Sequence, residues 1–387
     1  MAETEIDYNT VDSFELDNHL VLLKKNASRI QMLNPLAKMI WQSKKSGISS
    51  QTIANEISEV FDIPIELALQ DVISINAQLM LDLATKPEES LLLKKTIPLD
   101  KKFSSWQASF AVFFFFPNFT IRVNFDSQVI VDKVKCMLPH ITGSKTKVID
   151  AELNVISNSD VYLIVKDGVV VEQAESKNYI ALMVFHYIVD LASKSNDWLA
   201  ILHAAGVSWK EHSIVFPALG GSGKTTLTAA LIKHGFDYIN DDVIPLMRDT
   251  GELIHLPISL SIKSGSWPLL QSLYPDLESL EVFGSQERRI KYLAPPVNSS
   301  EQAVYAKNII LLNYKAGVTE KLESVSPAMA LQAIVEGESL LRLPLKKEDI
   351  AALIKWIKPL GCYRLTYDKL EPTVDLLRQF CIKNHQN

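Results

Sequence analysis

The stretch that most constrains the fold runs from Ala218 to Thr226, Ala-Leu-Gly-Gly-Ser-Gly-Lys-Thr-Thr. An apolar segment, residues 213–217, precedes it and a segment with helical character, residues 227–235, follows it. In such a strand, glycine-rich loop and helix, successive backbone N–H groups face one concavity and hold phosphate oxygens. The alternative is a Gly/Ser-rich turn that only caps a helix. We favour a phosphate-binding P-loop with ATP as its ligand.

Each residue type in this loop has a physical role in nucleotide binding. Lys224 would bridge the β- and γ-phosphates, and the hydroxyl of Thr225 would bind Mg²⁺. The other nucleotide-binding candidates are the glycines and hydroxyl residues around the lysine, namely Gly220, Gly221, Ser222, Gly223 and Thr226. The loop therefore predicts a site for ATP and Mg²⁺.

Two further features flank the loop: His203 in Leu-His-Ala-Ala-Gly-Val upstream, and the pair Asp241-Asp242 downstream. With these three elements, roughly residues 105 to 380 resemble the HPr kinase/phosphorylase family and its related kinases. The resemblance implies that Asp242 is the general base for the acceptor hydroxyl and that His203 supports it or the phosphates. A carboxylate pair at a strand end beside a P-loop also fits metal binding, so Thr225, Asp241 and Asp242 are the candidate metal ligands.

The same roles follow from chemistry. A hydroxyl is a poor nucleophile towards a phosphoryl group, so a carboxylate that accepts its proton helps, although positioning and charge neutralisation supply most of the catalysis. The alternatives are a core histidine at His203 and a plain turn at Asp241-Asp242. The apolar run 308–313 ends in an amide rather than a carboxylate, which favours a core strand.

Composition bounds the class of protein. A chain of 387 residues predicts two or three domains, and 47% hydrophobic with 22% charged residues is typical of a globular protein. The net charge of −6 provides no general attraction to nucleic acid or anionic membranes. The most apolar run, residues 110–116, is too short to cross a bilayer and predicts a buried strand. Three cysteines without metal spacing, and no signal peptide, favour a cytoplasmic location.

Residues 1–13 read as a flexible leader and residues 14–88 as a small unit of short strands followed by three helices. Asp17-Asn18-His19 predicts a turn between the first two strands, and Asn34-Pro35 predicts an N-cap and first position of a helix. The unit resembles the PqqD-like family of winged-helix domains that recognise precursor peptides. The matching positions are Leu33-Asn34, Ala37, Trp41, Gly47 and Asp71-Val72.

If that resemblance holds, a peptide would add a strand to the hairpin edge near Leu20 to Leu23. The alternative is a packing domain without a ligand. DNA binding is disfavoured because the second helix carries Glu56 and Glu59 but no lysine or arginine to contact phosphates. The family precedent for the remaining chain is a ring-like homo-oligomer.

Residues 89–104 read as a linker, and residues 105–387 as one domain that begins with strands, including 120–123, 148–150 and 161–165. Where HPr kinases place a metal-binding glutamate, this chain has Ser261-Ile262-Lys263-Ser264, so the second metal ligand is open. Lys263 would contact a phosphate or be solvated. The basic cluster 288–291 would neutralise transition-state charge, hold an acidic acceptor, or form a surface charge run.

The sequence thus predicts an α/β fold: an HPr kinase/PEP carboxykinase-like P-loop core with a strand-rich lobe, preceded by a small winged-helix-like α+β domain. The expected reaction is ATP-dependent phosphorylation of a serine or threonine hydroxyl on a ribosomally made precursor peptide or on a protein. A small-molecule or carbohydrate kinase of a biosynthetic cluster is the second hypothesis. A non-catalytic, nucleotide-gated binding protein is the third.

Overall fold

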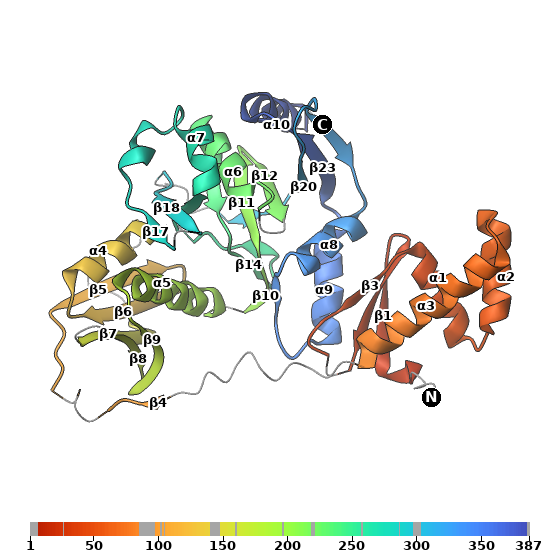
Figure 1. The fold of residues 1–387 in the computed structure, drawn as a ribbon, viewed down its shortest axis with the longest axis horizontal. Helices are drawn as coiled ribbons and strands as arrows, with labels where there is room; N and C mark the ends of the chain where they lie inside the picture. Colours follow the sequence, from red (N-terminus) through yellow and green to blue (C-terminus); the bar gives the residue numbers. More distant parts are fainter. Residues whose placement is uncertain are drawn as a thin grey trace.

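The computed structural model describes residues 7–25, 27–84, 97–100, 103, 105–139, 148–158, 161–195, 197–217, 221–256, 258–285, 287–296 and 303–384. The fold is mixed α/β (Figure 1), and the residues in these ranges form five sheets. Among the described residues, no helix has both the length and the apolar character needed to cross a membrane.

The N-terminal unit is a three-stranded antiparallel sheet in the order β1-β2-β3 followed by three helices. Asn34 caps the first helix by accepting a hydrogen bond from the N–H of Ala37, as the Asn-Pro pair predicts. Its elements are η1 Tyr8–Thr10, β1 Val11–Leu16, β2 His19–Lys24, β3 Gln31–Leu33, α1 Pro35–Lys45, α2 Ser50–Phe61 and α3 Ile65–Ala84.

Three expectations for this unit and for the linker after it need correction. Ordered structure starts before residue 14, because Val11 is buried and the Tyr8 ring packs on Trp41 with centroids 4.9 Å apart. The strand that contains Leu20 to Leu23, β2, is not an edge, because it pairs with β1 on one side and β3 on the other. Part of the expected linker is also a strand: Ile97–Pro98 forms β4, which pairs with β9 (Val169–Ala174).

The next unit is a six-stranded sheet in the order β4-β9-β8-β7-β6-β5. Helices α4 and α5 pack on one face of it and build a core with the alternating apolar residues of the strands. The remaining elements are β5 Phe110–Phe116, β6 Phe119–Phe125, α4 Gln128–Met137, β7 Ala151–Asn158, β8 Val161–Lys166 and α5 Lys177–Lys194.

Two strand predictions in this sheet are modified. Phe110–Phe116 is a strand, but it lies at the edge of the sheet and buries only alternate residues. Residues 148–150 precede β7 rather than forming a strand, and Val148 is 82% exposed. Asp150 instead joins the sheet end, where its carboxylate accepts a hydrogen bond of 2.7 Å from the backbone N–H of Thr120.

The rest of the chain is built on a second six-stranded sheet in the order β13-β11-β12-β20-β23-β21, in which β12, β20 and β23 run parallel. The expected core strand at 308–313 is confirmed as β20, at the centre of this sheet. The strands are β11 Ala204–Trp209, β12 His212–Pro217, β13 Asp237–Asn240, β20 Asn308–Tyr314, β21 Lys321–Ser324 and β23 Gly361–Tyr367.

Helices cover both faces of this sheet. On one face α6 and α10 share an apolar cluster with the strands, and on the other α8 and α9 do so. The same cluster on the α8 and α9 side contains Leu16, Val21, Leu23 and Ile30 of the N-terminal unit. The helices are α6 Lys224–Lys233, α7 Trp267–Leu270, α8 Pro327–Glu336, α9 Lys347–Ile357 and α10 Leu370–Asn384.

The N-terminal sheet is therefore buried on both faces. Its residues alternate between a cluster with α1 and α3 and the cluster with α8 and α9. Figure 1 shows the consequence: the N-terminal unit lies beside α9.

Two smaller sheets complete the fold. The first, in the order β19-β15-β14-β10-β22, has strands β10 Trp198–Leu202, β14 Ile244–Met247, β15 Glu252–Leu253, β19 Val304–Tyr305 and β22 Leu340–Leu341. The second, in the order β16-β18-β17, has strands β16 Leu260–Lys263, β17 Phe283–Gly284 and β18 Arg289–Leu293. Two short 3₁₀ helices, η4 Ser264–Ser266 and η5 Pro275–Ser279, lie between its strands.

Candidate functional site

The glycine-rich loop joins β12 to α6, which is the strand, loop and helix order that the sequence predicts. Gly221 and Gly223 have φ angles of 91° and 85°, in the left-handed region that favours glycine. A Cβ atom on Gly223 would also lie 2.5 Å from the hydroxyl of Tyr367. Gly220 lies outside the described residues. Any residue with a Cβ atom would therefore be strained at Gly221 or Gly223.

Lys224 is the first residue of α6 and is almost fully buried. Its Nζ lies 3.2 Å from Oδ1 of Asp242. Neither that ammonium nor the buried hydroxyl of Ser222 has a well-aligned hydrogen-bond partner among the described residues. The Ser222 hydroxyl, which is buried without a hydrogen bond, and the Lys224 ammonium, whose close partner is Asp242, suit an anionic ligand, because an unsatisfied buried polar group is costly.

The two threonines that follow have different partners. The hydroxyl of Thr225 donates a hydrogen bond of 3.1 Å to Oδ1 of Asp241. The hydroxyl of Thr226 lies 2.6 Å from that of Ser266. Of the two, Thr225 is the one whose hydroxyl lies beside a carboxylate, as a shared metal site requires.

Asp241 follows β13 and is 2% exposed. Burial, and after it the negative charge of Asp242, raise its pKa to about 8, against the opposing effect of Lys224. Its other oxygen, Oδ2, accepts a hydrogen bond of 3.4 Å from the backbone N–H of Ser261. A buried carboxylate with so little compensation suits a site that a cation would complete.

Asp242 is the centre of the polar contacts. Its Oδ1 lies near both Lys224 and His203, and its Oδ2 accepts a hydrogen bond of 2.9 Å from the hydroxyl of Ser261. Burial opposes ionisation, but the His203 imidazole and the Lys224 ammonium together hold the pKa of Asp242 below its ordinary value. Asp242 therefore carries a negative charge at neutral pH.

The backbone at Asp242 has a φ of 65°, an uncommon value for a residue other than glycine. Successive residues of a regular strand point to opposite faces. Because the chain leaves the extended conformation here, Asp241 and Asp242 both reach the start of α6, where they contact Thr225 and Lys224.

His203 lies where the chain passes from β10 in one sheet to β11 in another. Its Nδ1 is 2.9 Å from the carbonyl of Gly337, which only accepts, so Nδ1 carries a proton and donates it to that carbonyl. A hydrogen bond from the same ring to Asp242 then requires a second proton, on Nε2. Its backbone N–H donates to the hydroxyl of Ser339 at 3.0 Å. These contacts direct Nε2 towards Asp242, where it lies 3.5 Å from Oδ1.

Sequence reasoning missed Ser261, Gly337, Ser339 and Tyr367 as site residues. Ser261 stands in the run where the resemblance expects a metal-binding glutamate, and it contacts both aspartates instead. The hydroxyl of Tyr367 donates to the carbonyl of Ser222 at 3.3 Å. Gly337 and Ser339 have no sequence signal, because only the tertiary fold brings the end of α8 to His203.

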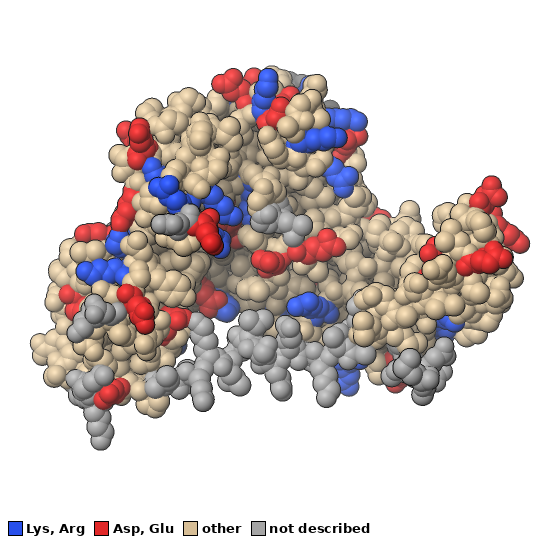
Figure 2. All heavy atoms as spheres, in the orientation of Figure 1, with Lys and Arg blue, Asp and Glu red and all other residues tan. Residues whose placement is uncertain are grey.

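The basic cluster divides into separate roles. Lys291 is buried and donates hydrogen bonds of 2.7 Å to the carbonyls of Leu277 and Glu278, so it stabilises the 3₁₀ helix η5. Arg289 stacks over Trp267 at 5.1 Å from the ring centroid. Figure 2 shows basic side chains gathered in the region of β18. Lys263 is exposed, and its contact with a phosphate stays a prediction.

Tyr292 and His186 extend the surroundings of Asp242. Burial, and after it the negative charge of Asp242, raise the pKa of Tyr292 to about 12. Burial also lowers the pKa of His186, and the positive charge of Arg288 lowers it further. Tyr292 is buried, whereas much of the His186 side chain is exposed.

The donors fit a magnesium ion only partly. The described residues contain no cluster of three or more His, Cys, Asp or Glu side chains arranged to hold a metal. Mg²⁺ is usually held by one or two carboxylates together with substrate phosphates and water. Asp241 and the Thr225 hydroxyl meet that smaller requirement, and Asp242 lies beside them.

Comparison with known proteins adds little. Neither a protein-family model nor a curated protein matches the chain. Among solved structures, the Hpr(Ser) kinase/phosphatase from Coxiella burnetii is similar over 48% of this chain and 95% of its own, with 15% sequence identity and a TM-score of 0.23. A TM-score this low does not establish a shared fold.

Proposed function

We propose that this chain is an ATP-dependent kinase that phosphorylates a serine or threonine hydroxyl of a peptide or protein. The observation that supports it is the meeting of Lys224, Asp242 and His203 at the start of α6, beside the contact between Thr225 and Asp241. Phosphoryl transfer requires a cation that binds the phosphates and a carboxylate that accepts the proton of the acceptor. It also requires a metal site, which a hydroxyl and a carboxylate can form together.

In this proposal Asp242 accepts the proton of the acceptor hydroxyl. Lys224 holds that carboxylate in the structure, and the ion pair contributes to its low pKa. When Lys224 turns to the phosphates, Asp242 loses one of the groups that stabilise its charge and becomes a stronger base. His203 keeps the carboxylate in place, with its own ring fixed by Gly337.

Magnesium would be held by Thr225 and Asp241, with Asp242 as a further candidate, and would neutralise charge on the phosphate oxygens. The glycine loop, Ser222 and Lys224 would hold the phosphates. A cation held there would supply the compensation that the buried Asp241 carboxyl, with a pKa of about 8, needs in order to ionise at neutral pH.

For the N-terminal unit we propose binding of a precursor peptide or another extended segment. A second hypothesis is a small-molecule or carbohydrate kinase in which the N-terminal unit packs against the rest of the chain and binds no peptide. The observation that favours the second is the burial of Leu16, Val21 and Leu23 against the α8 and α9 side, because a packing unit needs such a face. A nucleotide-gated binding protein is the third hypothesis.

The test is calorimetry with ATP and Mg²⁺, followed by mass spectrometry of candidate acceptors for a phosphorylated product. Lys224→Ala should lower the transfer rate by roughly a hundredfold or more, because the lost contact stabilises charge that grows in the transition state. Lys233→Ala, at the exposed end of the same helix, is the control and should retain activity. Absence of ATP binding by the wild type contradicts the proposal; binding without product favours the third hypothesis.

A further inference from the structure

The first strand of the N-terminal sheet has an unpaired outer edge. Among the described residues β1 pairs only with β2, and it lies at the end of the sheet order. The carbonyl of Thr10 accepts a hydrogen bond of 2.9 Å from the N–H of Lys25, which fixes the alternation of the antiparallel pairs. Asp12 and Phe14 therefore bond to β2, while the N–H and C=O groups of Ser13 and Glu15 face outward.

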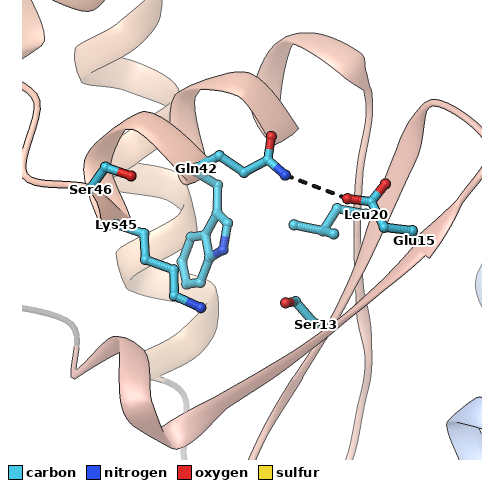
Figure 3. Close-up of a pocket in the computed structure, with 7 residues that line it drawn as sticks. Ser13, Glu15, Leu20, Gln42, Lys45 and Ser46 are labelled. Carbon is cyan, nitrogen blue, oxygen red and sulfur yellow. Dashed lines mark hydrogen bonds between the residues drawn. The ribbon is translucent and has the colours of Figure 1, made fainter.

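Hollows lie on both sides of this edge. On the side of α1, a cavity of about 320 Å³ is lined by Ser13, Glu15, Leu20, Trp41, Gln42, Lys45 and Ser46. Figure 3 shows the side chains from β1 and from α1 pointing towards one another across it. On the side of α9, an open groove of about 680 Å³ is lined by Phe14, Glu15, Ala351, Ile354, Lys355, Lys358 and Pro359.

The two hollows differ in chemistry. Around the α1 cavity most rim groups are polar, including Lys45, whereas Phe14, Ile354 and Pro359 make the α9 groove apolar with lysines on its rim. The carboxylate of Glu15 is already bound by Lys38 and Gln42. No carboxylate among the described residues forms an ion pair with Lys45, Lys355 or Lys358, so the edge has an excess of positive charge.

We propose that the outer edge of β1 binds an extended acidic segment of a partner protein as an additional strand. Side chains opposite Ser13 and Glu15 would fall on the α1 side, and those opposite Phe14 would fall in the α9 groove. The favoured segment therefore alternates acidic residues, facing Lys45, with apolar residues, facing Phe14 and Ile354. This inference rests on the proposed peptide-binding role of the N-terminal unit, but it requires no phosphoryl transfer.

The probe is a fluorescein-labelled peptide of four Val-Glu repeats, with four Val-Lys repeats as the charge control. Fluorescence anisotropy with the full chain, without nucleotide, should show binding of the acidic peptide and little binding of the basic one. Failure of the acidic peptide to bind, or equal binding of both peptides, overturns the proposal. Lys224→Ala should leave binding unchanged, which separates this result from failure of the kinase proposal.

Two kinds of variant test the geometry. Lys45→Glu should weaken binding about tenfold or more, because its carboxylate then faces the acidic side chains of the added strand. Lys44→Glu is the matched control, since Lys44 neighbours Lys45 but lies outside the cavity lining. If Lys44→Glu weakens binding equally, the attraction is general and the proposed surface is wrong.

Ser13→Pro removes one outward N–H but no hydrogen bond to β2, and proline is tolerated at such edge positions. It should weaken the acidic peptide roughly threefold to tenfold, with an unchanged circular dichroism spectrum. Unchanged affinity means that the peptide does not add as a strand. Sedimentation at the same protein concentration tests the other occupant, a second copy of this chain; a dimer that Ser13→Pro dissociates overturns the proposal in favour of that copy.

Discussion

The carboxylate of Asp17 accepts a hydrogen bond of 3.1 Å from the backbone N–H of Ala328. Asp17 lies in the turn between β1 and β2, and Ala328 lies in the first turn of α8. At the other end of α8, the carbonyl of Gly337 accepts from Nδ1 of His203. One helix thus connects the first hairpin of the chain to a residue of the candidate active site.

Asp17→Ala should lower the free energy of unfolding by roughly 0.5–2 kcal/mol, because it removes a carboxylate that satisfies a helix N-terminal N–H. Urea denaturation followed by circular dichroism measures the change. Asn18→Ala, at an exposed position in the same turn, should have a smaller effect. Equal effects of the two substitutions would assign no special role to the contact with Ala328.

Ser339→Ala should reduce the rate of phosphoryl transfer less than His203→Ala does. It removes the hydroxyl that accepts the His203 backbone N–H, but it leaves the contact between Nδ1 and Gly337. ATP affinity should stay unchanged in both variants, and Ser339→Thr should restore the rate. A larger loss for Ser339→Ala than for His203→Ala would place the serine, rather than the histidine, at the reaction.

Substitutions at Asp241 and at Asp242 should impair different steps. Asp242→Asn should keep ATP affinity but lose roughly two to four decades in rate, because a proton acceptor is removed. Asp241→Asn should instead weaken the dependence on Mg²⁺ concentration, because it removes the carboxylate beside Thr225. Steady-state rates over a magnesium titration distinguish the two. Loss of nucleotide binding in Asp242→Asn would identify Asp242 as a metal or structural residue.

Gly223→Ala should weaken ATP binding through two separate strains. The left-handed backbone costs about 1–2 kcal/mol for a residue with a Cβ atom, and the new Cβ atom meets the Tyr367 hydroxyl. Combining it with Tyr367→Phe removes the second strain but not the first, so affinity should recover in part. Calorimetry measures the recovery. Full recovery would show that only the contact with Tyr367 matters, and no recovery would show that only the left-handed backbone matters.

The three cysteines should react at different rates with a thiol reagent at pH 8. Burial raises the pKa of Cys362 to about 11 and that of Cys381 to about 12, so both stay protonated there. Cys136 is exposed, and its pKa is raised less, mainly by partial burial. Ellman's reagent should modify one thiol in the native protein and all three in urea. Rapid modification of more than one native thiol would contradict the burial of the other two.

Local features were predictable wherever the signal is itself local. The N-cap at Asn34, the strand, loop and helix around Lys224, and the core strand at 308–313 all follow from neighbouring residues. The start of the N-terminal unit was missed because residues 7–13 read as polar, although Tyr8 and Val11 pack inward. The polar composition of a segment does not show which of its side chains will be buried against helices that come later in the sequence.

The rest of the site depends on contacts between distant segments. The sequence shows two adjacent aspartates, but the left-handed backbone at Asp242 decides that both face α6. His203 was predicted from spacing, whereas its two anchors come from the end of α8 and the residues after it. Hydrogen bonds of this kind leave no pattern in the sequence, since any backbone carbonyl can accept them.

The doubly buried N-terminal sheet has a consequence for how this protein can be cut or recombined. Leu16, Val21 and Leu23 would meet water if the first 88 residues were expressed alone, and so would the surface of α8 and α9 if those residues were deleted. Each fragment would expose an apolar patch to solvent and tend to aggregate. Exchanging the N-terminal unit between such chains would therefore also require exchanging the faces of α8 and α9 that it covers.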